Sequence, residues 1–143
     1  MVEIACVLLG SAISIVTTIG FECYQERKRK KYYANVLYHD LLSIMQYFKG
    51  EYKWDETDMY PEIRYNADWQ SAVANLTYLR DNQIKLVHNI YDAVFDYDYL
   101  LSRTKGKKKR KEYRCKIEKI VNGYEFGEFM LFLKRKLKIK EQA

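Results

Sequence analysis

The sequence predicts an all-α protein in which one N-terminal transmembrane helix continues into a cytoplasmic antiparallel bundle of about four helices. Three observations predict this fold class. Residues 4–21 form an apolar stretch without a single charge. The rest of the chain repeats apolar residues at steps of three and four, which is the helical period. Only six glycines and one proline occur in 143 residues, a composition that opposes a many-turned β architecture.

The apolar stretch is long enough to cross a bilayer. Its 18 residues would cover roughly 27 Å as a helix, close to the ~30 Å hydrocarbon core of a membrane. Positive charge lies after the stretch rather than before it, unlike in a secretory signal peptide. Positive-inside reasoning therefore predicts a single-pass protein of the cell membrane, with residues 1–3 outside the cell and residues 22–143 in the cytoplasm. The residues that give this topology signal, and that also suit anionic lipid headgroups, are Arg27, Lys28, Arg29, Lys30 and Lys31.

Small residues share one face of the predicted span. Gly10 and Ser14 are four residues apart, and Thr17 and Thr18 continue the same face. A small-xxx-small pattern permits close helix–helix contact in lipid. Two interpretations remain open here: a homo-oligomer that packs through Gly10, Ser14, Thr17 and Thr18, or ordinary membrane-helix composition.

The cytoplasmic part divides into a juxtamembrane helix, a loop and the remainder of the bundle. Residues 22–49 predict a basic juxtamembrane helix that ends at Gly50, with apolar residues at steps of three and four. The sequence predicts that residues 50–66 form the only long irregular stretch and that residues 67–143 form the rest of the bundle. In that remainder we expect a helix that begins near Asn66 or Asp68, followed by a second helix over the amphipathic segment that ends near Leu101. These two helices could be continuous. A third helix is expected to end at Asn122, and a last one to extend from Glu125 to Lys140.

Two further basic segments suggest binding surfaces. Residues 103–111 predict a loop whose basic residues could contact phosphate or another anion, namely Lys107, Lys108, Lys109, Arg110 and Lys111. Nucleic acid is not the expected partner, because no recognition helix or stacking sheet accompanies the charge. The last helix has two open interpretations: a core helix with a solvated cationic end, or a helix lying on an anionic membrane. The residues that would meet that membrane are Phe126, Phe129, Phe132, Lys134, Arg135 and Lys136.

No catalytic, cofactor or metal site is predicted. His39 has no second metal ligand at helical spacing, and His88 lies beside an apolar stripe, where a core or boundary histidine is expected. Three widely spaced cysteines form neither a disulfide framework nor a zinc site. Protease, hydrolase and phosphate-loop motifs are missing from the sequence, so an enzyme is not expected.

These observations predict a class of function rather than an activity. The first hypothesis is a membrane-anchored module that senses or binds a protein partner or small ligand at the cytoplasmic face, as an oligomer. The alternative is a membrane-disrupting effector, of toxin or defence type, whose helical domain controls assembly of the transmembrane helices.

Overall fold

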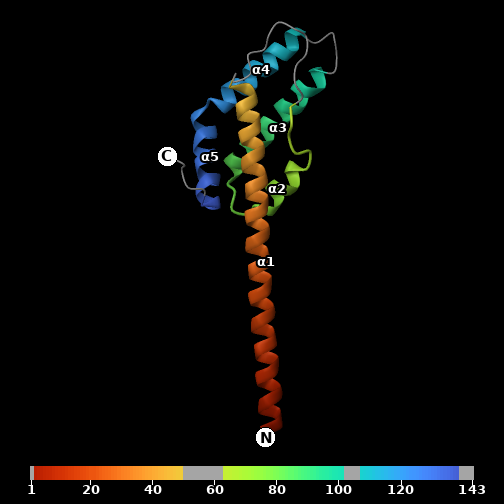
Figure 1. Cartoon of the computed structure of the whole chain (residues 1–143), viewed down its shortest axis with the longest axis vertical. Helices are drawn as coiled ribbons and strands as arrows, with labels where there is room; N and C mark the ends of the chain where they lie inside the picture. Colours follow the sequence, from red (N-terminus) through yellow and green to blue (C-terminus); the bar gives the residue numbers. More distant parts are fainter. Residues whose placement is uncertain (1, 50–62, 102–106, 139–143) are drawn as a thin grey trace.

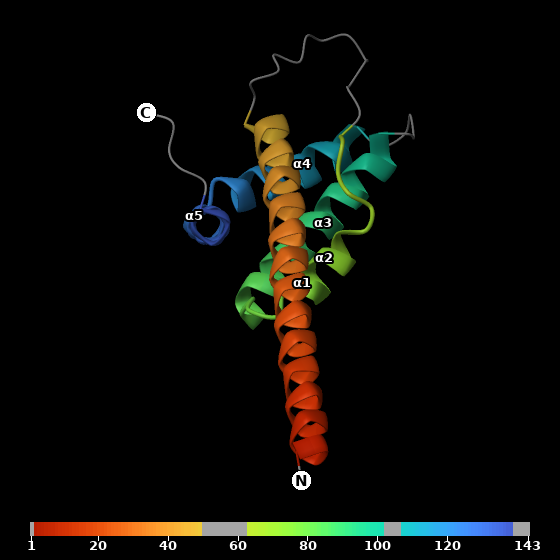
Figure 2. The same cartoon turned by 60° about the horizontal axis from the view of Figure 1, so that its bottom comes forward.

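The computed structural model describes residues 2–49, 63–101 and 107–138, with side chains from Gly10 onward except at positions 101, 107, 108 and 110. These residues form five α-helices and no strand, so the predicted all-α class is confirmed for the part of the chain that is described. The helices are α1 (Val2–Phe48), α2 (Trp69–Asn75), α3 (Asp81–Leu101), α4 (Lys107–Val121) and α5 (Tyr124–Leu137). Figures 1 and 2 show a bundle around one end of α1, whose other end projects far beyond it.

Helix α1 is one uninterrupted helix of 47 residues. Its second half forms a wall of the bundle, with Ala34, Leu37, Leu41 and Ile44 each at most 1% exposed. Its N-terminal part projects beyond the other helices in Figure 1, and residues 10–29 of this part are all exposed; we call it the stalk. The same helix therefore serves two environments, and the change between them falls near residue 33.

The other helices close the core around α1. Helices α2, α4 and α5 approach α1 directly, and α3 lies along α4. Contact between α1 and α3 is made by long aromatic side chains. The ring of Tyr97 on α3 lies 5.3 Å from Phe48 and 6.5 Å from Tyr47. Large aromatic side chains bury extensive apolar area and can fill the space between helices whose backbones stay apart.

Several predicted boundaries need correction. The segment after α2 is not helical: α2 ends at Asn75, and α3 begins at Asp81 after a turn in which the backbone N–H of Leu79 donates to Leu76. The basic run is not a loop throughout, because residues 107–111 open α4. Asp68 precedes α2 without capping it, since its carboxylate accepts from the Ser71 hydroxyl instead of a backbone N–H. Residues 50–62 of the predicted loop lie outside the described residues.

Helix α5 follows the core-helix alternative. Phe126 and Phe129 are 1% and 2% exposed, and Leu133 is fully buried. Phe132 is only partly buried and lies against the edge of the core. Phe126 and Phe129 therefore cannot insert into a membrane while the bundle is folded, which corrects the interpretation of α5 as a helix lying on the bilayer through all three rings.

We expect Leu133→Ala to destabilise the bundle by about 2–5 kcal/mol, because it removes a fully buried side chain and leaves a cavity. Leu131→Ala is the matched control, since Leu131 lies on the same helix but is 42% exposed. Denaturant unfolding of the full chain measures both. Equal losses in the two variants would show that α5 is not packed as described.

Candidate functional site

The stalk presents apolar side chains on all sides of α1. Ile13, Ile15, Val16, Ile19 and Phe21 are each more than half exposed. These positions are spread around the helix rather than along one stripe, so docking of a single neighbouring helix would not cover them all. Among the residues whose side chains are described, which in α1 begin at Gly10, no helix is long and apolar enough to cross a membrane.

The two threonine hydroxyls of the stalk are hydrogen-bonded within α1. Thr17 donates to the carbonyl oxygens of Ile13 and Ser14 at 3.0 and 2.9 Å, and Thr18 donates to Ser14 at 2.9 Å. A Cβ atom built on Gly10 would meet nothing within 4 Å. The predicted packing face is therefore open, and its threonines need no partner outside the helix.

The basic cluster of α1 lies between the stalk and the bundle. Arg27, Lys28, Arg29 and Lys31 are exposed, whereas Lys30 is partly buried and pairs with Glu26 at 2.6 Å. Such a surface pair between neighbouring helical turns contributes little to the stability of the folded chain.

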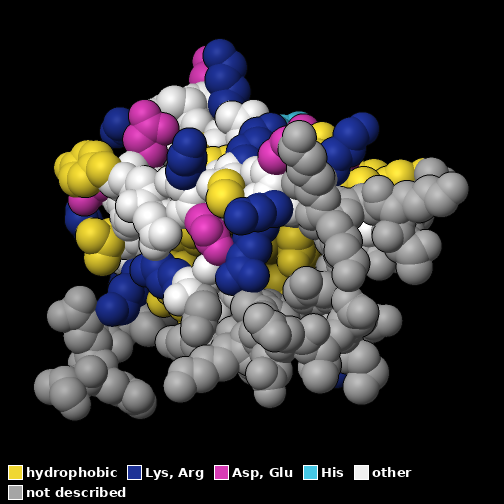
Figure 3. All heavy atoms as spheres, turned by 90° about the horizontal axis from the view of Figure 1, so that it is seen from above, with side chains coloured by type: hydrophobic (Ala, Val, Ile, Leu, Met, Phe, Trp, Pro, Cys, Tyr) yellow, Lys and Arg dark blue, Asp and Glu magenta, His cyan; other side chains and the backbone are white. Residues whose placement is uncertain are grey.

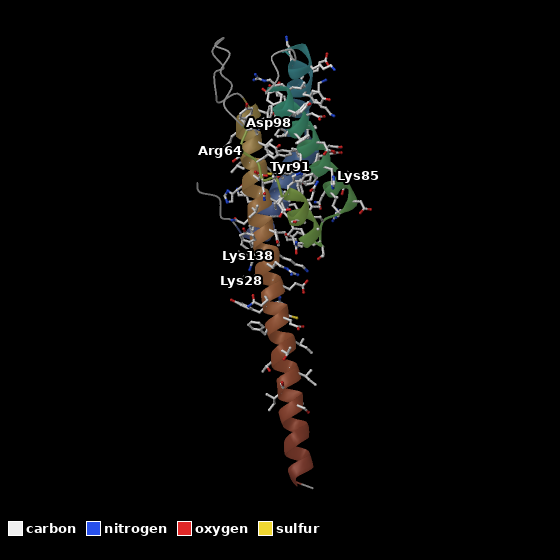
Figure 4. The ribbon with its side chains drawn as sticks, turned by 90° about the vertical axis from the view of Figure 1, so that its right-hand side faces the viewer. Lys28, Arg64, Lys85, Tyr91, Asp98 and Lys138 are labelled. Carbon is white, nitrogen blue, oxygen red and sulfur yellow. The ribbon has the colours of Figure 1, made fainter. Side chains whose placement is uncertain are left out.

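The basic end of α5 lies at the same end of the bundle. Helix α5 runs antiparallel to α1, so its C-terminus points toward the stalk (Figure 1). Figure 4 shows Lys138 and Lys28 at nearly the same level along the molecule. The ammonium of Lys136 lies 5.1 Å from the Tyr78 ring and 5.6 Å from Phe132, an arrangement that holds its charge beside the turn between α2 and α3. The sequence did not predict this proximity, because α1 and α5 are separated by most of the chain.

The predicted anion site at residues 107–111 lies at the opposite end. Helix α4 begins at the end of the bundle farthest from the stalk (Figure 1). Lys109 and Lys111 are exposed there. Figure 3, which looks at this end, shows acidic side chains interspersed among the described basic ones. The described side chains therefore form no continuous basic patch at this end.

A polar cluster that we did not predict links α1, α3 and the segment before α2. The backbone N–H of Asn66 donates to both carboxylate oxygens of Asp40, at 3.0 Å each. The Tyr91 hydroxyl donates to the same carboxylate. The Tyr91 ring is 1% exposed and stacks on Trp69 at 4.6 Å between ring centres. The signal was a charged residue, Asp40, within the apolar stripe of α1.

Burial sets the ionisation of this cluster. Desolvation raises the pKa of Asp40, and the two hydrogen bonds from Tyr91 and Asn66 oppose this effect without cancelling it. Burial also raises the pKa of Tyr91, with a further contribution from the charge of Asp40. Tyr91 is therefore a hydrogen-bond donor to the carboxylate throughout the physiological range.

A shallow groove runs beside Asp40. Its volume is about 450 Å³, and it is lined by Asn35, Val36, His39, Asp40, Ser43, Arg64, Tyr65 and Asn66. Both carboxylate oxygens of Asp40 are already engaged, and no group of three or more potential metal ligands occurs among the described residues. The described residues of the groove therefore form no preformed catalytic or metal geometry.

The histidines and cysteines take separate positions. His88 is exposed, contrary to the core position considered for it, and its ring meets the Trp69 ring edge-on at 4.7 Å. His39 packs edge-on against Tyr38. Cys23 and Cys115 are free and exposed on different helices. None of these side chains pairs with another to form a nucleophile–base arrangement in the part of the chain that is described.

Comparison with known proteins adds no relative, because no protein-family model, curated protein or solved structure matches this chain.

We expect Asp40→Asn to change how stability depends on pH. Because the folded-state pKa of Asp40 lies above its ordinary value of 3.8, the stability that wild-type Asp40 contributes is fully present below that value and is lost as pH rises through the folded-state pKa. The stability of the wild type relative to Asp40→Asn should therefore fall as the pH rises through the folded-state pKa of Asp40. Denaturant unfolding at several pH values measures it, with exposed Asp92→Asn as control. Parallel curves for wild type and Asp40→Asn would contradict the raised pKa.

Proposed function

We propose that this protein is a single-pass membrane-anchored helical module, held at the cytoplasmic face with its N-terminus outside. The observation that carries the proposal is the projecting stalk of α1, whose described apolar side chains are exposed on every side and which leads directly into five consecutive basic residues. The bundle is then the part that senses or binds a protein partner or small ligand.

The solvent exposure of the stalk supports the membrane part of the proposal. Burial of apolar surface is favourable by about 25 cal/mol per Å², and the exposed side chains from Ile13 to Phe21 receive none of this from their own bundle. Lipid would cover all sides of such a helix. The uncharged sequence extends back to Ile4, which gives the 18 residues needed for the span.

The internal hydrogen bonds of Thr17 and Thr18 support the same environment. A hydroxyl group without a partner is costly in hydrocarbon, whereas one bonded to its own helix is tolerated. Both hydroxyls are bonded in this way.

We further propose that the spans associate through the face that contains Gly10 and Ser14. The absence of any atom within 4 Å of a Cβ at Gly10 leaves room for a second backbone. Helices in lipid approach most closely at such small residues.

We expect the full chain to remain with membranes after an alkaline wash, and Ile13→Lys combined with Val16→Lys to be released. Each lysine near the bilayer centre costs about 2.5–3.5 kcal/mol. Both positions are exposed in the folded chain, so the bundle should be unaffected. Ile13→Leu with Val16→Leu is the control and should stay bound. Recovery of the wild-type chain in the soluble fraction would overturn the membrane proposal.

We expect Gly10→Ile to reduce the oligomer size measured in detergent, because the larger side chain separates the paired helices. Ala12→Ile is the matched control: Ala12 is also small and exposed but lies on the opposite face of α1. Neither variant creates a clash within one chain. An unchanged size for Gly10→Ile, or equal effects of both variants, would contradict association through this face. Dye leakage from vesicles containing the same chains tests the alternative effector function.

A further inference from the structure

Two basic segments that are distant in the sequence meet at the stalk end of the bundle. We define the basic rim as Arg27, Lys28, Arg29, Lys30, Lys31, Lys134, Arg135, Lys136 and Lys138. We propose that this rim binds anionic phospholipid headgroups and holds the bundle against the membrane surface in a fixed orientation, with the C-terminal end of α5 toward the lipid. This inference rests on the proposed membrane anchor and adds a lipid class and a binding surface to it.

The charge of the rim is strongly one-sided. Five basic residues come from α1 and four from the end of α5. Among the described residues, Glu22 and Glu26 are the acidic residues shortly before the five basic residues of α1, and no acidic residue occurs in α5 after Glu128. Of these, Glu26 is engaged by Lys30. A net positive surface of this kind attracts a leaflet that contains anionic lipid.

The fold, not only the sequence, creates the rim. Phe129, Leu133 and Leu137 are buried, and they fix the last turns of α5 in the bundle. The chain leaves α5 at Lys138, whose φ of 54° ends the helix with a left-handed residue. The exposed charges of Arg135, Lys136 and Lys138 are therefore held at the stalk end by the core.

The rim is also at the right height above the lipid. Lys28 is seven residues beyond Phe21, so it lies roughly 10 Å from the hydrocarbon edge if Phe21 marks that edge. Headgroups occupy about 5–7 Å of this distance on each side of a bilayer, and the Debye length at physiological salt is about 8 Å. Lys138 lies near the level of Lys28 (Figure 4), so the charges of α5 also fall within reach of the headgroups.

The opposite end of the bundle provides an internal comparison. Lys109, Lys111 and Lys119 are exposed on α4, away from the stalk. Basic and acidic side chains are interspersed there (Figure 3). If only the net charge of the protein mattered, lysines at both ends of the bundle would contact anionic lipid equally, whereas a localised rim gives contact at the stalk end alone.

The test uses the full chain in lipid nanodiscs of two compositions, one of phosphatidylcholine alone and one in which a third of the lipid is phosphatidylserine. A water-soluble amine-reactive reagent modifies the lysines, and mass spectrometry gives the rate at each position. We expect Lys28, Lys136 and Lys138 to react about fivefold more slowly in the anionic discs. Lys109, Lys111 and Lys119 should react equally in both. High salt should abolish the difference, because it screens the charges.

A matched pair of variants tests whether the protection comes from the rim itself. Arg135→Gln with Lys138→Gln should weaken the protection of Lys136 in anionic discs. Lys109→Gln with Lys111→Gln removes the same charge near the start of α4, at the far end of the bundle, and should leave the protection of Lys136 unchanged. Equal effects of the two variants would contradict a localised surface.

The outcomes separate the rim from the anchor. Incorporation of the chain into neutral discs tests the anchor alone. If the chain incorporates and Lys28 is protected but Lys136 and Lys138 are not, the bundle stands away from the surface and the rim proposal fails while the anchor stands. Protection that appears equally in neutral discs also overturns the rim. Protection that disappears on nuclease treatment would assign the surface to nucleic acid and overturn it as well.

Discussion

The architecture depends on the continuity of α1. A single helix of 47 residues forms both the projecting stalk and a wall of the bundle. No glycine or proline occurs between Phe21 and Lys49, so nothing in the sequence bends the helix where it leaves the bundle. The apolar stretch is therefore held clear of the core and cannot fold back to be covered by it. The straight helix also fixes the distance between the apolar stretch and the basic residues Arg27–Lys31, and it fixes which end of the bundle lies next to the stalk.

Aromatic side chains join α3 to α1, where the backbones of these two helices stay apart. Tyr97 lies against Phe48, and Tyr91 spans from α3 to the carboxylate of Asp40. The burial of Asp40 is tolerated because Tyr91 and Asn66 donate to it. This arrangement explains the tyrosine at position 91, since a tyrosine can fill an apolar gap and still satisfy a polar group at its far end.

Helical periodicity was sufficient to predict the all-α class and the approximate positions of α3 and α5, because local apolar spacing records which face is buried. It was not sufficient where two readings share one local pattern. The aromatic face of α5 suits either a core or a membrane, and only the packing of Phe126 and Phe129 against other helices distinguishes them. Residues 103–111 looked like a loop around Gly106, yet residues 107–111 open α4. The proximity of Lys28 and Lys138 and the pairing of Asp40 with Tyr91 depend on tertiary contacts between distant segments, which spacing within one segment does not record.

The proposed function requires that the apolar part of α1 lies in lipid. Spin labels placed singly at Ile13, Val16 and Ile19 of the full chain in vesicles measure this environment most directly. These positions are exposed, so the labels should not disturb the bundle. Collision with oxygen, which dissolves in hydrocarbon, and with a water-soluble nickel chelate reports the surroundings of each label. If lipid surrounds the helix, all three labels should show high accessibility to oxygen and low accessibility to the nickel chelate. High nickel accessibility, equal to that of a label at exposed Cys115 on α4, would place the stalk in water and contradict the account.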